Sequence, residues 1–145
     1  MSHSSNQSRR DFIAMSGSFL AGSFFIHPVA QALDLVGPKD GKMKLALVGT
    51  GIRGTTMFGR DVLRSYGELV EFVGLSDINP GRLAYAKKFI GANCPVFTDF
   101  DQMLKEAKPD VLIVTTMDST HHEFIIKGLD AGIHVISEKP MTTDE

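Results

Sequence analysis

The chain has 145 residues, of which 43% are hydrophobic and 22% are charged, an ordinary composition for one globular domain. Its 15 lysines and arginines against 17 aspartates and glutamates give a net charge of -2, which offers no basic face for nucleic acid and no polybasic membrane patch. A single cysteine, Cys94, excludes an internal disulfide, and cysteines and histidines form no cluster at metal-ligand spacing. These features favour small-molecule chemistry.

The first 32 residues have the layout of an export signal. Paired arginines precede an apolar stretch from Ile13 to Ile26, and residues 30–32 (Ala-Gln-Ala) supply a small-x-small cleavage site. The Ser-Arg-Arg-x-Phe order resembles a twin-arginine signal, which predicts a periplasmic or otherwise exported protein. An apolar stretch of about 14 residues is shorter than the roughly 20 that span a bilayer. We therefore expect cleavage after Ala32 and no stable membrane anchor.

After a linker at residues 33–43, apolar and amphipathic segments alternate. Strands are expected at Lys44–Val48, Val70–Leu75, Val96–Phe97, Asp110–Thr116 and Ile133–Ser137. Helices are expected at Ile52–Tyr66, Pro80–Phe89, Phe100–Ala107 and Thr120–Asp130. Regular alternation with short connections predicts an α/β fold, a doubly wound parallel sheet of the Rossmann type with helices on both faces.

Local signals define the ends and faces of these helices. Asp99 with Gln102, and Thr120 with Glu123, have the spacing of helix-start capping pairs. Hydrophobic side chains of the first helix are expected on one side: Met57, Phe58, Val62 and Tyr66.

Three glycines follow the first expected strand and open the first expected helix, in the order Gly49-x-Gly51-x-x-Gly54. In a dinucleotide site the first permits a tight turn, the second lets the backbone approach a pyrophosphate, and the third lets the helix pack close to the strand. The unpaired amides and positive end of the helix favour phosphate. Alternatives are a purely structural glycine corner or another nucleotide such as S-adenosylmethionine. The candidate cofactor contacts in this turn are Gly49, Thr50, Gly51, Ile52, Arg53 and Gly54.

Asp77 lies at the end of the second expected strand, about 20 positions beyond the glycines. An acidic residue at that place accepts hydrogen bonds from the adenosine ribose hydroxyls. Because a carboxylate repels a 2'-phosphate, Asp77 favours NAD over NADP. Arg82 is close enough in sequence to weaken that preference.

The final residues place Thr142 or Thr143 to cap a helix that the sequence does not supply. We therefore expect residues 44–145 to be an incomplete dinucleotide-binding domain. The substrate domain would lie in a further part of a longer protein.

The segment "AGIHVISEKPMT" follows "TTMDSTHHEFIIKGLD", and with "GTGIRG" and "SDINP" it resembles the glucose-fructose oxidoreductase / inositol dehydrogenase (Gfo/Idh/MocA) family. The resemblance covers the chain from Lys44 to its end. It implies that Lys139 is the catalytic residue, reaching the nicotinamide and the reacting substrate hydroxyl. It also implies that Glu138 and Pro140 contact the cofactor.

The resemblance extends to the turn after the fourth expected strand. Thr116 and Met117 stand where the family commonly has a Thr-Pro turn, and His121 stands where a histidine heads the next helix. These three residues are implied cofactor contacts. A lysine ammonium beside a bound nicotinamide can orient or help deprotonate an alcohol, so the role implied for Lys139 is chemically reasonable.

The resemblance implies an NAD-dependent oxidoreductase that acts on a secondary alcohol of a sugar or cyclitol, and the signal in residues 1–32 predicts that it is exported. The resemblance also implies a homo-oligomer formed through a C-terminal domain, and no catalysis by these 145 residues alone. One alternative is a glycosidase of the same family that holds and recycles NAD. Another is a non-catalytic nucleotide- or sugar-binding module.

Overall fold

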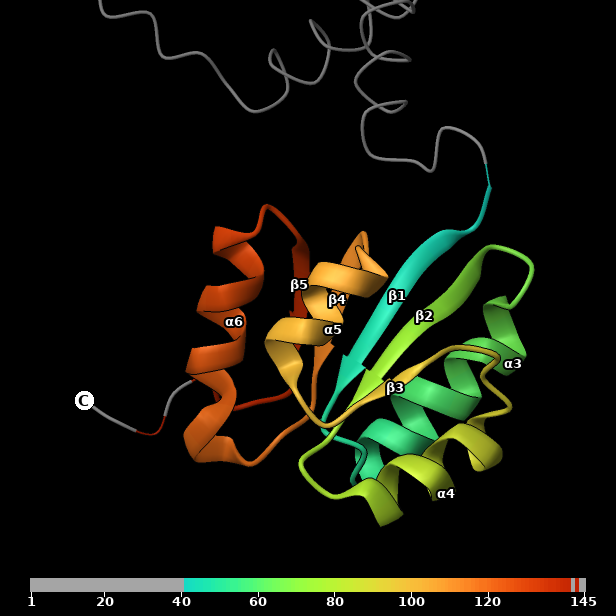
Figure 1. Cartoon of the computed structure of the whole chain (residues 1–145), viewed down its shortest axis with the longest axis horizontal. Coiled ribbons are helices and arrows are strands. Elements are labelled where there is room, and N and C mark those ends of the chain that lie inside the picture. Colours follow the sequence, from blue (N-terminus) through green and yellow to red (C-terminus); the bar gives the residue numbers. More distant parts are fainter. Residues whose placement is uncertain (1–40, 142, 144–145) are drawn as a thin grey trace, which may run out of the picture. The chain divides into compact units, whose positions relative to one another are not determined.

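A computed structural model describes residues 41–141 and 143, built around a five-stranded parallel sheet (Figure 1). The expected export signal lies outside the described residues. The strands are β1 (Met43–Val48), β2 (Val70–Ser76), β3 (Val96–Phe97), β4 (Val111–Val114) and β5 (His134–Ser137). Their order in the sheet is β3-β2-β1-β4-β5, and every pairing is parallel. This confirms the predicted doubly wound fold.

The helices that connect the strands begin and end close to the predicted residues. They are η2 (Gly54–Asp61), α3 (Val62–Tyr66), α4 (Pro80–Ile90), α5 (Phe100–Ala107), η3 (Asp118–Thr120) and α6 (His121–Asp130). None of the helices among the described residues is long and apolar enough to cross a membrane.

The central strand β1 supplies side chains to two separate hydrophobic cores. Leu45 and Leu47 pack with η2, α3 and α4 on one face of the sheet. Ala46 and Val48 pack with α5 and α6 on the other face. Figure 1 shows these two groups of helices on either side of the sheet. Because side chains alternate along a strand, an unbroken apolar run such as residues 45–48 of β1 must be covered on both faces.

One of the two helix caps predicted from the sequence is present in the structure. The Asp99 carboxylate accepts a hydrogen bond from the Gln102 amide at 2.9 Å, as predicted for the start of α5. The prediction for α6 is wrong, because the Thr120 side chain makes no cap. Its hydroxyl donates instead to the Met117 carbonyl oxygen at 2.8 Å, since the short helix η3 turns the chain just before α6.

The helix predicted at Ile52–Tyr66 contains a π-helical segment, η2, which alters the face that it buries. A π-helix has more residues per turn than an α-helix, so an α-helical face drifts along it. Met57 and Tyr66 are exposed, against prediction, whereas Phe58 and Val62 pack against the core.

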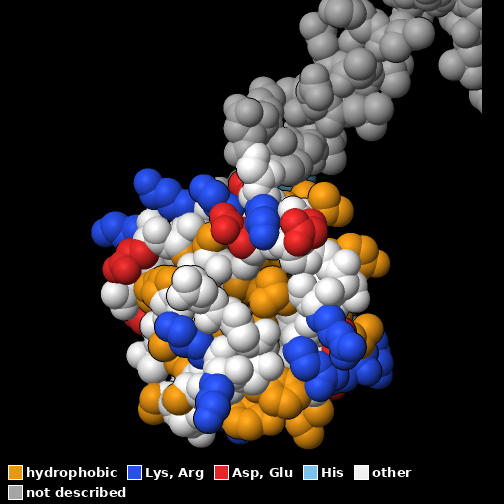
Figure 2. Space-filling view, turned by 90° about the vertical axis from the view of Figure 1, so that its right-hand side faces the viewer, with side chains coloured by type: hydrophobic (Ala, Val, Ile, Leu, Met, Phe, Trp, Pro, Cys, Tyr) orange, Lys and Arg blue, Asp and Glu red, His pale blue; other side chains and the backbone are white. Residues whose placement is uncertain are grey.

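The surface carries charges of both signs. On the face in view in Figure 2, lysine and arginine side chains stand in small separate groups between hydrophobic and uncharged ones. Acidic side chains gather near the upper edge of that face.

Truncation of a buried leucine should destabilise this fold strongly. Leu112 in β4 is 0% exposed and lies where α6 approaches the sheet at Gly128. We expect Leu112→Ala to lower the free energy of unfolding by about 2–5 kcal/mol, because it leaves a cavity that the neighbours cannot fill. Equilibrium unfolding in urea measures this change.

Leu129→Ala is the matched control, since Leu129 lies on α6 and is 58% exposed. We expect it to change the free energy of unfolding by no more than about 0.5 kcal/mol. Equal losses for the two variants would contradict the assignment of Leu112 to the core.

Candidate nucleotide site

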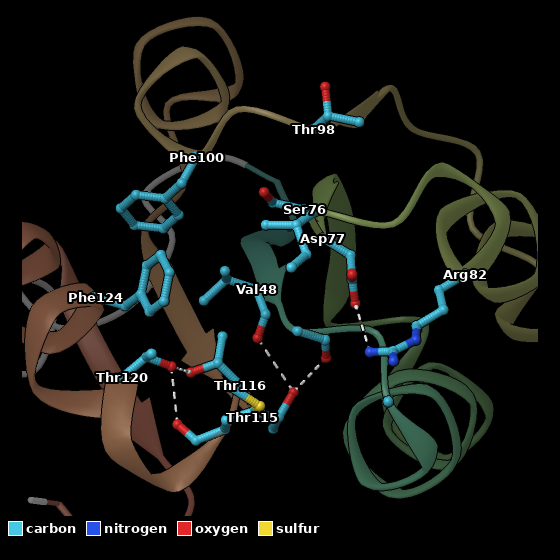
Figure 3. A pocket seen from close by; sticks show the side chains of 14 residues that line it. Val48, Ser76, Asp77, Arg82, Thr98, Phe100, Thr115, Thr116, Thr120 and Phe124 are labelled. Atoms are coloured by element: carbon cyan, nitrogen blue, oxygen red, sulfur yellow. Dashed lines mark hydrogen bonds and ion pairs between the residues drawn. The ribbon is translucent and has the colours of Figure 1, made fainter.

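A cavity of about 420 Å³ lies at the carboxyl ends of the strands (Figure 3). Val48, Ser76 and Thr115 bring the ends of β1, β2 and β4 to it. The lining residues are Val48, Gly49, Gly51, Ser76, Asp77, Ile78, Arg82, Thr98, Phe100, Thr115, Thr116, Met117, Thr120 and Phe124. In open parallel sheets ligands bind outside these strand ends, where the strand order reverses. Here the order reverses between β1 and β4.

Gly49 makes the turn that leads from β1 into the helix. Its φ of +89° lies in the left-handed region that favours glycine. A Cβ at this position would lie 2.5 Å from the Thr115 carbonyl oxygen. The Thr115 hydroxyl donates to the carbonyl oxygen of Gly49 at 2.6 Å, which fastens the turn to the end of β4. The backbone geometry therefore requires glycine here.

The other two glycines of the motif differ in what surrounds them. A Cβ on Gly54 would collide with the Gly49 carbonyl oxygen and lie 2.5 Å from the Thr115 hydroxyl, so Gly54 permits close packing of helix on strand. A Cβ on Gly51 would meet nothing within 4 Å. The protein's own packing does not require glycine at position 51. An open backbone there is what the close approach of a pyrophosphate needs.

Asp77 lines the cavity although it is only 7% exposed. Its Oδ2 accepts hydrogen bonds from the Thr50 amide at 2.8 Å and the Thr50 hydroxyl at 2.9 Å. Its Oδ1 accepts one from the Asn79 amide at 2.9 Å. The structure also brings Arg82 beside it, with Nη1 4.0 Å from Oδ2. Thr50 itself is buried and does not line the cavity.

The cavity has an apolar side and a charged side. Figure 3 shows the rings of Phe100 and Phe124 at one side and the Asp77–Arg82 pair at the other, with Val48 between them. The two rings meet edge to face with their centroids 4.8 Å apart. A ligand that combines a flat ring with hydroxyl groups suits such a lining.

Arg53 and Glu138 connect the glycine turn to the segment after β5. Arg53 Nε donates to Glu138 Oε1 at 2.9 Å, and its Nη2 makes a second bond to the same oxygen. This hydrogen bonding by Arg53 holds the pKa of Glu138 below its usual range. Lys139 follows directly, and its side chain is exposed. The predicted contacts that do not line the cavity also include Ile52, Arg53, Gly54, Glu138, Lys139 and Pro140.

The residues after β4 divide between the cavity and the interior. Thr116 and Met117 line the cavity. His121 is 1% exposed and lies outside the lining. Its Nδ1 lies 2.6 Å from the Pro140 carbonyl oxygen and its Nε2 lies 3.1 Å from that of Thr116. A neutral imidazole carries one N–H and can donate to only one of them. His121 thus holds the turn after β4 against the segment after β5.

Several lining residues were missed by sequence reasoning, including Thr98, Thr115 and the two phenylalanines. Thr98 follows β3 and Thr115 follows β4 directly. A search for the residue after each expected strand would have found Thr98, but not Thr115, because the expected fourth strand ran on to Thr116 whereas β4 ends at Val114. Among the described residues, histidine, cysteine, aspartate and glutamate form no group of three that could hold a metal ion.

Residues 43–145 match the family model described as "Oxidoreductase family, NAD-binding Rossmann fold", GFO_IDH_MocA. The chain belongs to this family. The match confirms the predicted family. Because the family is NAD-binding, it also confirms NAD as the predicted cofactor.

Three proteins that are similar in sequence to this chain carry different names. The chain is 36% identical over 103 residues to YteT of Bacillus subtilis (strain 168), covering 68% of this chain and 24% of that protein. It is 33% identical over 101 residues to inositol 2-dehydrogenase 3 of Saccharopolyspora erythraea, covering 67% and 29%. It is 32% identical over 109 residues to glycosyl hydrolase family 109 protein 1 of Akkermansia muciniphila, covering 72% and 23%.

Among solved structures, the fold resembles the WlbA dehydrogenase of Chromobacterium violaceum in complex with NADH and UDP-GlcNAcA. The TM-score is 0.67 at 32% identity, covering 74% of this chain and 30% of that one. The chain thus spans between 23% and 30% of the length of these four proteins.

The low pKa of Glu138 makes its ion pair sensitive to acid. A carboxyl whose pKa is depressed in the folded state contributes stability above its unfolded pKa, about 4.3, and loses it as the pH falls through the folded value. We expect Arg53→Gln to raise the pKa of Glu138 toward its ordinary value, because the variant removes the charged donor. NMR titration of the Glu138 side-chain carbonyl carbon measures this shift.

Arg60→Gln is the matched control, since Arg60 pairs with Asp61 and not with Glu138. It should leave the Glu138 titration unchanged. A midpoint that is the same in Arg53→Gln and in the unmodified protein would show that the pair does not form in solution.

Proposed function

We propose that this chain is the cofactor-binding part of an exported NAD-dependent oxidoreductase that acts on a secondary alcohol of a sugar or cyclitol. The observation that carries the proposal is the contrast among the three glycines. Packing leaves no room for a Cβ at Gly49 or Gly54, whereas the space at Gly51 is open toward the cavity. Close approach of a ligand to the backbone would explain glycine at this position.

The residues around the cavity suit the parts of the dinucleotide. The amides of residues 51–54 open a helix, so they and its positive end favour the pyrophosphate. Asp77 lines the cavity, and its Oδ1 accepts one hydrogen bond from Asn79, so this oxygen could accept another from a ribose hydroxyl. Apolar side chains along the cavity offer contact to a flat base. When bound, NAD supplies the hydride acceptor for the alcohol.

Lys139 is the residue through which this chain would act on the alcohol. Its ammonium is exposed, so it is accessible to a substrate outside the cavity. Arg53 pairs with Glu138, the residue directly before it, and so limits the movement of the backbone that carries it. Lys139 would donate a hydrogen bond to the substrate oxygen and orient the C–H bond toward the nicotinamide.

The substrate class and the location rest on different observations. Inositol 2-dehydrogenase and a dehydrogenase crystallised with a nucleotide sugar are similar to this chain, which supports a polyhydroxylated substrate. The twin-arginine pattern in residues 1–32 supports export.

A second candidate, a glycosidase, is favoured by the similarity to a glycosyl hydrolase family 109 protein. Such an enzyme would return the hydride within each turnover and consume no NAD, which suits a location without a supply of free cofactor. Incubating the full-length protein with NAD, free sugars and cyclitols, and chromogenic glycosides separates the two. NADH accumulation supports the oxidoreductase, whereas release of the chromophore without NADH supports the glycosidase. The absence of both would contradict both.

Gly51→Ala tests the proposed site directly. Because a methyl group fits there in the free protein, we expect the free energy of unfolding to change by no more than about 0.5 kcal/mol. Because that methyl group meets the pyrophosphate, we expect NAD to bind at least about tenfold more weakly, a loss of about 1.4 kcal/mol. Isothermal titration calorimetry with NAD and unfolding in urea provide the two measurements.

Gly49→Ala provides the contrast, since its Cβ would be forced against the Thr115 carbonyl. That variant should lose folding stability as well as NAD binding. If Gly51→Ala binds NAD as tightly as the unmodified protein, the pyrophosphate does not pass this turn and the proposed site is wrong.

A further inference from the structure

The hydrogen bonds of Asp77 leave it little freedom. A carboxylate has about four lone-pair positions. Two donors of Thr50 occupy Oδ2, and the Asn79 amide occupies one position on Oδ1. Arg82 Nη1 is 4.0 Å from Oδ2, beyond hydrogen-bond distance. About one acceptor position therefore remains, on Oδ1.

Thr50 makes two different contributions to this arrangement. Any residue at position 50 would supply the backbone amide, but only a hydroxyl side chain supplies the second donor. Thr50 is itself held in place, because its carbonyl oxygen accepts a hydrogen bond from the Thr55 hydroxyl at 3.0 Å. The Thr50 side chain is buried, so water cannot readily replace its hydroxyl.

Arg82 is the alternative partner of the same carboxylate oxygen. Its side chain is largely exposed. A short rotation of the Asp77 carboxylate toward Arg82 would turn the 4.0 Å contact into a charge-assisted hydrogen bond. The two bonds from Thr50 oppose that rotation.

We propose that Thr50 is a specificity-determining residue, whose hydroxyl positions the Asp77 carboxylate so that the site selects NAD over NADP. Held by Thr50, Asp77 presents Oδ1 to the ribose 2'-hydroxyl and its charge repels a 2'-phosphate. Without the Thr50 hydroxyl, Asp77 turns to Arg82, its charge is neutralised, and NADP is tolerated. This inference rests on the proposed dinucleotide site.

The test is the ratio of the dissociation constants for NADP and NAD, measured by calorimetry on the full-length protein. We expect Thr50→Val to lower this ratio about tenfold, equivalent to about 1.4 kcal/mol, and Thr50→Ser to restore it. Thr56→Val is the matched control, because the Thr56 hydroxyl bonds the Ile52 carbonyl oxygen and does not contact Asp77. It should leave the ratio unchanged.

A second set of variants covers the case in which Thr50→Val does not fold. Thr50→Ala and Thr50→Cys also remove the hydroxyl, with smaller side chains than valine, and should lower the ratio in the same direction. In the double variant Thr50→Ala with Arg82→Gln, the alternative partner is absent. The threonine substitution should then lower the ratio much less than it does when Arg82 is present.

The outcomes separate this inference from the proposed function. If the unmodified protein binds neither dinucleotide, the proposed site itself fails. If it binds NAD and the hydroxyl-free variants keep the same ratio, the site stands and the role of Thr50 is wrong. An equal loss in Thr50→Ser would also overturn it, because that variant retains the hydroxyl.

Discussion

The contact between Gly49 and the end of β4 is the constraint on which the site depends. The turn passes so close to the Thr115 carbonyl oxygen that a Cβ would lie 2.5 Å from it. The Thr115 hydroxyl then bonds the Gly49 carbonyl, which joins the ends of β1 and β4 where the strand order reverses. Because these contacts hold the turn close to β4, the helix starts directly beside the strand ends. The cavity at that edge and the open backbone at Gly51 both follow from this geometry.

Side chains of the turn contact residues at the ends of strands on either side of β1 in the sheet. Thr50 reaches toward β2 and holds Asp77 with two hydrogen bonds, while Arg53 reaches toward β5 and pairs with Glu138. A bound dinucleotide would have its adenosine end near Asp77 and its reactive end near Glu138, if Lys139 acts as the family resemblance implies. One short turn would then position the two groups that recognise opposite ends of the cofactor. A disturbance at the turn should therefore affect both binding and chemistry.

The fold could be predicted from the sequence almost completely, because strand and helix periodicities are local properties. The glycine turn and Asp77 could be predicted as well, since each lies at a definite distance from a strand end. The failed cap at Thr120 depended on the short helix η3, which no periodicity signals. The bonds of Thr50 to Asp77 and of Arg53 to Glu138 join residues 27 and 85 positions apart. Such pairings follow from the assembled sheet, and a single sequence does not contain them.

A crystal structure of the full-length protein with NAD would test the central claim most directly. The account predicts the pyrophosphate beside Gly51, the adenosine in the cavity at the carboxyl ends of β1, β2 and β4, and a ribose hydroxyl donating to Asp77 Oδ1. Ordered NAD at any other place, or crystals saturated with NAD in which the cavity holds none, would contradict it.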